Sequence, residues 1–154
     1  MPVRETEEDL KREAAVAVEV GKAFRCDMEK LPKFYPLDWV ALRGEDKTIV
    51  GFIEIKCREY PSTQFTSMWM GVKKVSEIRG IHLTTGLKCL VFFKFTDDKL
   101  GWCDAISDYG LTFGMRGRTD RDDPDDIQPM VFYPVAKLRW VTGSSGEKNV
   151  LSPT

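Results

Sequence analysis

Residues Gly51–Glu59 read GFIEIKCRE and lie within a longer run, Ile49–Arg58, that has the length and apolar content of a buried β-strand. Successive side chains of a strand point to opposite faces, so Glu54 and Lys56 point to the same face. That face should carry only apolar residues if the strand is buried. An acid and an amine at these two positions therefore indicate either an ion pair or a functional site.

The segment before this strand supplies a second acid. Phe34–Arg43 (FYPLDWVALR) alternates as a strand does, and the residues GEDKT predict a turn into Ile49–Arg58, so the two segments form a hairpin. In the first strand, Asp38 begins a face that is otherwise apolar. We expect the hairpin to bring Asp38 close to Glu54 and Lys56.

A helix from about Thr6 to Arg25 supplies a third acid. Thr6 is a suitable N-cap, and the acids that follow it suit the first turn of a helix. At about 100° per residue, Glu13 falls in the middle of the apolar stripe of this helix, whereas Glu19 falls on its polar face. Glu13 is therefore expected to face inward.

The rest of the chain predicts one more helix and several strands. A polar loop, Tyr60–Ser67, leads to a helix from about Val72 to Thr85, with Gly86 at its C-terminal cap. Further strands are expected at Lys88–Phe95, Leu100–Ile106 and Met130–Val141, with a long loop at Asp108–Gln128. This order predicts an α/β fold in which helices flank a central mixed β-sheet. We expect one domain over residues 1–142 and a disordered tail over residues 143–154.

Composition narrows the class of protein. Of the 154 residues, 42% are hydrophobic and 31% are charged, as in ordinary globular proteins. No apolar run approaches the ~20 residues that a membrane helix needs, and the charged N-terminus lacks the apolar core of a signal peptide. We therefore expect a cytoplasmic location. The four cysteines have no CxxC spacing and there is one histidine, which argues against a zinc site.

Inward-facing carboxylates that converge repel one another unless a positive charge neutralises them. Mg²⁺ prefers oxygen ligands and binds through one or two carboxylates together with waters and substrate phosphates. With an ammonium group such as that of Lys56 beside it, such a cluster indicates phosphodiester hydrolysis. Structural explanations remain open: Glu54 and Lys56 as an exposed ion pair, Asp38 as a turn cap after Pro36, and Glu13 as the partner of a lysine.

Two short motifs resemble the signature of the PD-(D/E)xK nuclease superfamily. They are PLD at Pro36–Asp38 and EIK at Glu54–Lys56. The resemblance covers roughly residues 6–106 and is strongest to small single-domain phage and bacterial members, through LPKFYPLD and EIKCR. It implies a restriction-endonuclease-like α-β-β-β-α-β core with extra C-terminal strands. The literal PD pair is absent, because Leu37 stands between the proline and the aspartate.

The resemblance also implies roles at the site. Asp38, Glu54 and the backbone carbonyl of Ile55 would hold Mg²⁺ or Mn²⁺. Lys56 would be the catalytic lysine. Glu13 would be an auxiliary acid that binds the metal ion directly or through water.

Substrate contacts are implied as well. The segment MGVKKVSEI is similar to the opening of the family's second helix, so Lys74, or Lys73 in its place, would face the site. Arg58 could touch a phosphate or pair with Glu59. The aromatic residues Trp69, Trp102 and Phe113 could stack on bases or belong to the core.

The predicted function is a metal-dependent deoxyribonuclease, in the host cytoplasm if the protein is phage-encoded. Homo-oligomerisation would extend its DNA footprint. The alternative is a non-catalytic or partner-dependent nuclease-fold module that binds DNA or protein in a phage or mobile-element context.

Overall fold

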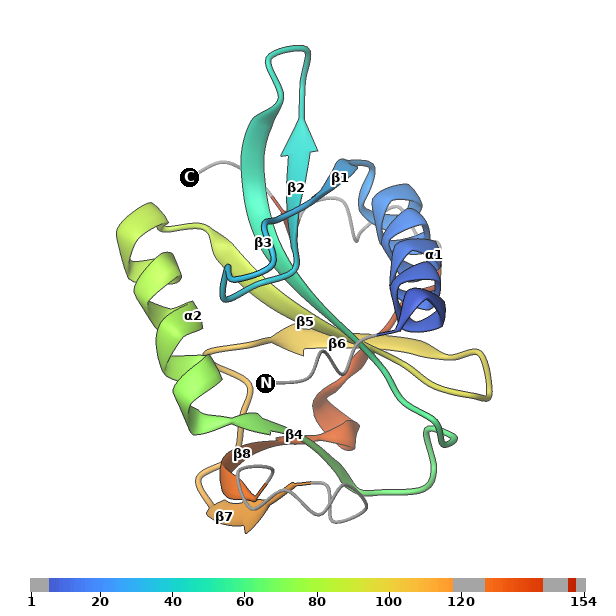
Figure 1. Ribbon diagram of the computed structural model, residues 1–154, viewed down its shortest axis with the longest axis vertical. Coiled ribbons are helices and arrows are strands. Elements are labelled where there is room, and N and C mark those ends of the chain that lie inside the picture. Colours follow the sequence, from blue (N-terminus) through green and yellow to red (C-terminus); the bar gives the residue numbers. More distant parts are fainter. Residues whose placement is uncertain (1–5, 118–126, 143–149, 152–154) are drawn as a thin grey trace.

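The computed structural model describes residues 6–117, 127–142 and 150–151, which form two α-helices and nine β-strands. Their order is α1 (Glu7–Phe24), β1 (Asp27–Lys30), β2 (Trp39–Arg43), β3 (Thr48–Cys57), β4 (Ser67–Gly71), α2 (Val72–Thr85), β5 (Lys88–Lys94), β6 (Leu100–Asp104), β7 (Phe113–Arg116), β8 (Gln128–Pro134) and β9 (Arg139–Trp140). A six-stranded sheet has the order β1-β2-β3-β5-β6-β9, and a small second sheet has the order β4-β8-β7 (Figure 1). Only β3 and β5 pair in parallel among these strands. The predicted α/β fold with a mixed sheet is confirmed.

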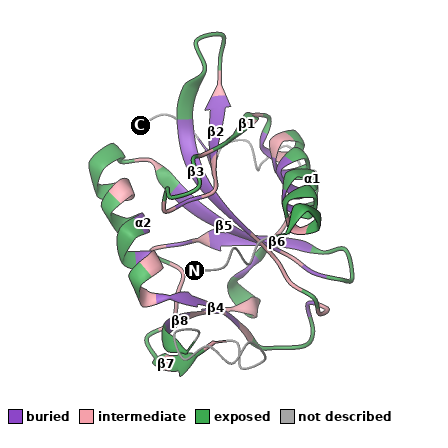
Figure 2. Ribbon diagram, in the orientation of Figure 1, coloured by how far each residue is buried: buried purple, intermediate pink, exposed green. Residues whose placement is uncertain are grey.

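The two helices lie on opposite sides of the main sheet (Figure 1). On the α1 side, Val20 and Phe24 pack into a core with Ile53 of β3. On the other side, Ile78 of α2 packs into a second core with Phe52 of β3, and the buried face of the small sheet joins this core. The central strands are buried, as Figure 2 shows in purple. Side chains alternate along β3 from Phe52 onward, so Phe52 and Glu54 lie on the side that faces α2.

The residues that the sequence predicts as caps start α1 and end α2. Thr6 caps α1, because its hydroxyl accepts a hydrogen bond from the Asp9 N–H at 3.1 Å and the Asp9 carboxylate accepts one from the Thr6 N–H. Gly86 ends α2 in the left-handed conformation at φ 71°, and its N–H donates to the His82 carbonyl. Neither helix of the described ranges is long and apolar enough to cross a membrane.

Two strand predictions and one loop prediction need correction, and two further strands were not predicted. The expected strand at Phe34–Arg43 begins only at Trp39, and β1 and β4 lie in segments that carry no alternating apolar pattern.

The expected strand at Met130–Val141 is two strands. β8 pairs with β4 and ends at Pro134, after which a 3₁₀ turn (Val135–Lys137) carries the chain to β6, where β9 pairs. The expected loop at Asp108–Gln128 contains β7, and its residues 118–126 lie outside the described ranges.

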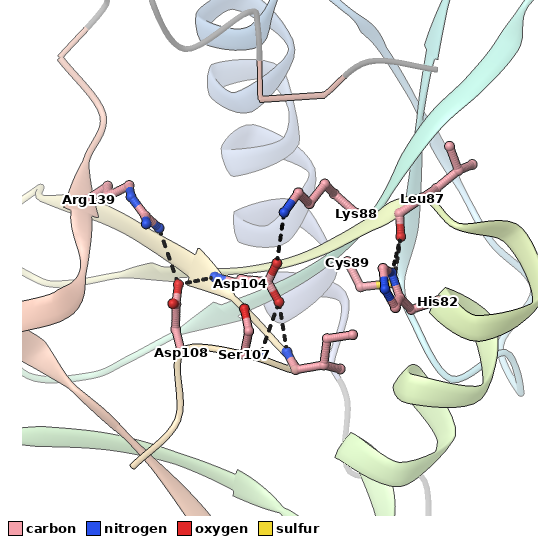
Figure 3. A network of polar contacts seen from close by, with 9 residues as sticks. His82, Leu87, Lys88, Cys89, Asp104, Ser107, Asp108 and Arg139 are labelled. Atoms are coloured by element: carbon pink, nitrogen blue, oxygen red, sulfur yellow. Dashed lines mark hydrogen bonds and ion pairs between the residues drawn. The ribbon is translucent and has the colours of Figure 1, made fainter. Parts of the chain in front are cut away.

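A network of acids fixes the end of β6 (Figure 3). Asp104 accepts a hydrogen bond from the Ser107 N–H at 3.2 Å and forms an ion pair with Lys88 at 3.5 Å. Asp108 accepts a hydrogen bond from the Asp104 N–H at 2.7 Å and pairs with Arg139 of β9 at 3.2 Å. Each acid is occupied by main-chain and cationic partners, so this cluster holds the turn together.

Part of the expected C-terminal tail belongs to the core. Leu151 is fully buried within the α1-side core, and its carbonyl accepts a hydrogen bond from Arg43. Gly51 makes room for it, because a Cβ at Gly51 would collide with the Leu151 side chain. This corrects the expectation of disorder for residues 150 and 151, while residues 143–149 and 152–154 lie outside the described ranges.

We expect Leu151→Ala to lower the free energy of unfolding by about 2 to 5 kcal/mol, because it removes a fully buried side chain and leaves a cavity. Leu83→Ala is the matched control, since Leu83 is 74% exposed on α2. Urea denaturation of the two variants and the parent measures the difference. Equal midpoints for both variants would show that the C-terminal residues do not contribute to the core.

Candidate active site

The β2–β3 hairpin sets the position of the first two acids. Trp39 pairs with Ile53 and Val40 with Phe52. Continuing this register by one residue places Asp38, which immediately precedes β2, opposite Glu54 and on the same face of the sheet. Burial and then the neighbouring Glu54 carboxylate raise the pKa of Asp38 from 3.8 to about 6. The two carboxyl groups are therefore neighbours, as the sequence predicts.

Glu54 lies at the centre of the group, with only 4% of its side chain exposed. Its Oε2 atom is 3.6 Å from the Lys56 ammonium and 3.2 Å from that of Lys74, which projects from α2. Its Oε1 atom is buried and has no hydrogen-bond partner within the described residues. A buried oxygen without a partner is costly, so this carboxylate has an acceptor that a ligand could use.

The lysines have different surroundings. Burial lowers the pKa of Lys56, and the Glu54 carboxylate opposes that change. Lys74 comes from the first turn of α2, whose buried residues Val75 and Ile78 hold the helix against the sheet. Lys73, one residue earlier, is exposed. Of the two lysines that the sequence proposes for this position, Lys74 is the one that reaches Glu54.

A groove of about 750 Å³ opens beside this group. Four cationic side chains line it against two acidic ones, namely Arg12, Lys56, Arg58 and Lys74 against Asp9 and Glu59. Arg58 lies against the rings of Trp69 and Phe93, with its guanidinium carbon 5.9 Å and 5.7 Å from their centroids, and burial lowers its pKa. Such a groove suits a phosphate backbone.

Glu13 does not complete a cluster of three carboxylates. It extends from α1 and accepts hydrogen bonds from the Trp39 indole N–H at 2.8 Å and from the Lys30 ammonium. Among the described residues, no group of three or more His, Cys, Asp or Glu side chains could hold a metal ion. The expected convergence of all three acids is therefore corrected: Asp38 and Glu54 form a pair, and Glu13 binds Lys30.

Lys30 is the site residue that sequence reasoning missed. It pairs with Trp39 across β1 and β2, and its charge opposes the rise in the pKa of Asp38. It therefore links Glu13 to the carboxylate pair electrostatically. The missing signal was β1 itself, because the residues DMEK have neither apolar alternation nor buried side chains.

The sequence comparisons give the family. A family model described as "Phage putative PDDEXK endonuclease" matches residues 1–141. The chain belongs to this PDDEXK family. No curated protein matches the sequence at a significant level.

A solved structure supports the same fold for this PDDEXK chain. It is Hjc of Archaeoglobus fulgidus, described as a Holliday junction resolvase from an archaeal hyperthermophile. The alignment has a TM-score of 0.56 and 16% sequence identity, and it covers 83% of this chain and 84% of that chain. At this identity the likeness shows the fold alone, which is the restriction-endonuclease-like architecture expected from the motifs.

The residues of this PDDEXK site fit the divalent metal ion that the fold family implies. Two neighbouring carboxylates supply hard oxygen donors, and the Oε1 atom of Glu54 is an available acceptor. A cation held by Asp38 and Glu54 would offset the burial and the neighbouring negative charge that together raise the pKa of Asp38. The carbonyl of Ile55 belongs to the residue that follows Glu54 on β3, and its role as a ligand stays a prediction.

We expect Lys74→Ala to lower the rate of DNA cleavage about a hundredfold, because it removes a positive charge directed at the carboxylate pair. Lys73→Ala changes the same residue type one position away on an exposed side of the helix, and it should have little effect. Single-turnover cleavage rates of both variants check this. A larger loss in Lys73→Ala would show that Lys73 is the lysine that acts.

Proposed function

We propose that the protein is a metal-dependent DNA nuclease that hydrolyses phosphodiester bonds with Mg²⁺ or Mn²⁺. This proposal rests on the surroundings of the Glu54 side chain. This carboxylate is buried opposite Asp38, has an acceptor oxygen without a partner, and faces two lysines at a cationic groove. Membership of a PDDEXK endonuclease family supports the same conclusion.

In this proposal Asp38 and Glu54 hold the metal ion, with the Ile55 carbonyl as a third donor. When bound, such an ion supplies positive charge at the scissile phosphate and lowers the pKa of a water molecule. Lys56 keeps its amine beside Glu54, where it can stabilise charge on the phosphate or orient the attacking water. Glu13 acts from outside the pair by holding Lys30.

The proposed substrate is DNA, whose backbone would follow the groove. Lys74 and Arg58 lie within that groove and would contact phosphates on either side of the cut. The similarity of the fold to a Holliday junction resolvase makes branched DNA one of the substrates to test. Branched DNA is therefore compared with linear and nicked DNA in the experiment below.

The experiment has two parts. Calorimetric titration with Mn²⁺ should show binding to the parent that disappears in Asp38→Ala. Digestion of linear, circular, nicked and branched DNA should require the metal ion and should fail in Lys56→Ala. Metal binding without cleavage of any of these substrates would favour the partner-dependent module, and absence of both would overturn the proposal.

A further inference from the structure

The outer face of the small sheet carries two aromatic side chains next to each other. Trp69 of β4 and Phe132 of β8 are directly paired, so their side chains lie on one face. Their strand neighbours Met68, Met70 and Tyr133 point to the other face and are buried in the core. Trp69 and Phe132 are themselves only half-buried. Aromatic side chains on an accessible sheet face are a recurrent platform for stacking nucleic-acid bases.

A cleft of about 320 Å³ lies over this pair. Its lining residues are Phe65, Thr66, Ser67, Trp69, Thr112, Arg116 and Phe132. Phe65 stands edge-on to Trp69, with ring centroids 5.6 Å apart, and is 41% exposed. Gly114 of β7 allows the Phe132 ring to lie close to the strand, because a Cβ there would be 3.3 Å from the ring. The cleft therefore combines ring faces, hydroxyl groups and one exposed guanidinium, that of Arg116.

The cleft adjoins the catalytic groove through Trp69, which lines both. On the groove side, the Arg58 guanidinium lies 5.9 Å from the Trp69 ring centroid. A DNA strand whose phosphates lie against Arg58 would thus have a base within reach of the cleft. A base in a paired duplex is stacked and cannot enter, whereas an unpaired base can.

We propose that this cleft binds an unpaired nucleobase of the DNA held in the groove, stacked on Trp69 and Phe132, with Arg116 against the adjoining phosphate. The proposal rests on the proposed nuclease function and adds a preference for DNA that contains unpaired nucleotides. Of the other aromatic candidates in the sequence, Trp102 is buried in the core at 4% exposure, and Phe113 is exposed but does not line the cleft.

The test compares two DNA probes in EDTA, which prevents cleavage. One is a duplex with a single-stranded flap that carries the fluorescent base 2-aminopurine, and the other is the fully paired duplex of equal length. We expect binding to quench the 2-aminopurine fluorescence of the flap probe. Phe132→Leu should lower the ratio of flap affinity to duplex affinity about tenfold, Phe132→Tyr should restore it, and Phe113→Leu should leave it unchanged.

The inference is overturned if Phe132→Leu leaves the affinity ratio unchanged, if Phe113→Leu lowers it equally, or if the flap probe does not bind. Thermal unfolding of each variant checks its fold. Mn²⁺-dependent cleavage of the paired duplex, compared with Glu54→Gln, tests the nuclease function separately. Cleavage without the base effect removes only the cleft proposal, and quenching without cleavage removes only the nuclease.

Discussion

Glu54→Gln is expected to reduce metal-dependent DNA cleavage by about a thousandfold or more, because the neutral amide cannot replace the carboxylate as a metal ligand. The side chain keeps its size, so packing against the second core is preserved. Single-turnover cleavage with saturating Mg²⁺ or Mn²⁺ measures the loss. The matched control is Glu59→Gln, since the Glu59 side chain is 80% exposed at the rim of the same groove.

The same substitution should also destabilise the protein by about 1–3 kcal/mol at neutral pH. Glu54 is the common partner of Lys56 and Lys74, and breaking a buried ion pair leaves uncompensated charge. The Lys56 side chain is 26% exposed, so solvent limits the cost. Urea denaturation in EDTA measures it. Undiminished cleavage by Glu54→Gln would remove the metal-site proposal, and undiminished stability would show that the two lysines do not depend on this carboxylate.

The hairpin that carries the acids could be predicted because its signals are local. β3 is buried on both faces and reads as a near-continuous apolar run, so Glu54 and Lys56 stand out within it. The turn sets the pairing only for the residues next to it, because a β-bulge between Ala41 and Leu42 shifts the register by one residue. The shifted register places Asp38 opposite Glu54. The helix positions also follow from local patterns, since Thr6 and Gly86 mark helix ends.

The surroundings of Glu13 could not be predicted because they depend on tertiary structure. A helical wheel shows that Glu13 faces inward, but it cannot show which part of the sheet the helix covers. In the structure α1 packs on the face opposite α2, and Glu13 meets Trp39 and Lys30 there. The sequence did not predict a role for Lys30, because β1 forms a strand through its pairing with β2 and has no buried side chains.

Lys74 illustrates an intermediate case. Lys73 and Lys74 are lysines at adjacent positions. The rotation of α2 about its axis decides which of them faces the site. Lys74 lies four residues before Ile78, the fully buried residue of α2, so both lie on the same side of the helix. That spacing was a usable signal. By contrast, the cleft over Trp69 required β4 and β8, whose pairing joins segments far apart in the chain.

Asp38→Asn is expected to have the opposite effect on stability from Glu54→Gln while also abolishing cleavage. The pKa of Asp38 in the folded protein is about 6, above its ordinary value of 3.8, chiefly because of burial and then the Glu54 carboxylate. At pH 8 the folded protein must keep this carboxylate ionised in an unfavourable place. The amide removes that cost, so we expect a gain of about 2 kcal/mol in the free energy of unfolding without divalent metal ions.

The raised pKa of Asp38 determines how the difference in stability between the parent and Asp38→Asn changes with pH. Between about pH 4 and pH 6, the folded parent takes up a proton at Asp38 that the unfolded chain does not, so the contribution of this group to stability rises as the pH falls through 6. Asp38→Asn lacks this contribution, so its advantage over the parent should be largest above pH 6 and should vanish near pH 4. Urea denaturation in EDTA at pH 8, 6 and 4 measures it. An advantage independent of pH would mean that the folded protein does not raise the pKa of Asp38.

Metal ions should reverse the order of stability. A divalent ion that binds the folded parent through Asp38 and Glu54 stabilises it by mass action, whereas Asp38→Asn lacks one of the two carboxylates and should gain little. The melting temperature of the parent should therefore rise with Mn²⁺ concentration while that of the variant stays nearly constant. Asp108→Asn is the control, because Asp108 is tied to Arg139 and the Asp104 N–H rather than to the carboxylate pair. A variant that is more stable than the parent in EDTA, yet does not respond to the metal ion and does not cleave, would show that the unfavourable burial of the Asp38 carboxylate beside Glu54 serves metal binding. An equal Mn²⁺ response in the parent and Asp38→Asn would show that the metal ion binds elsewhere.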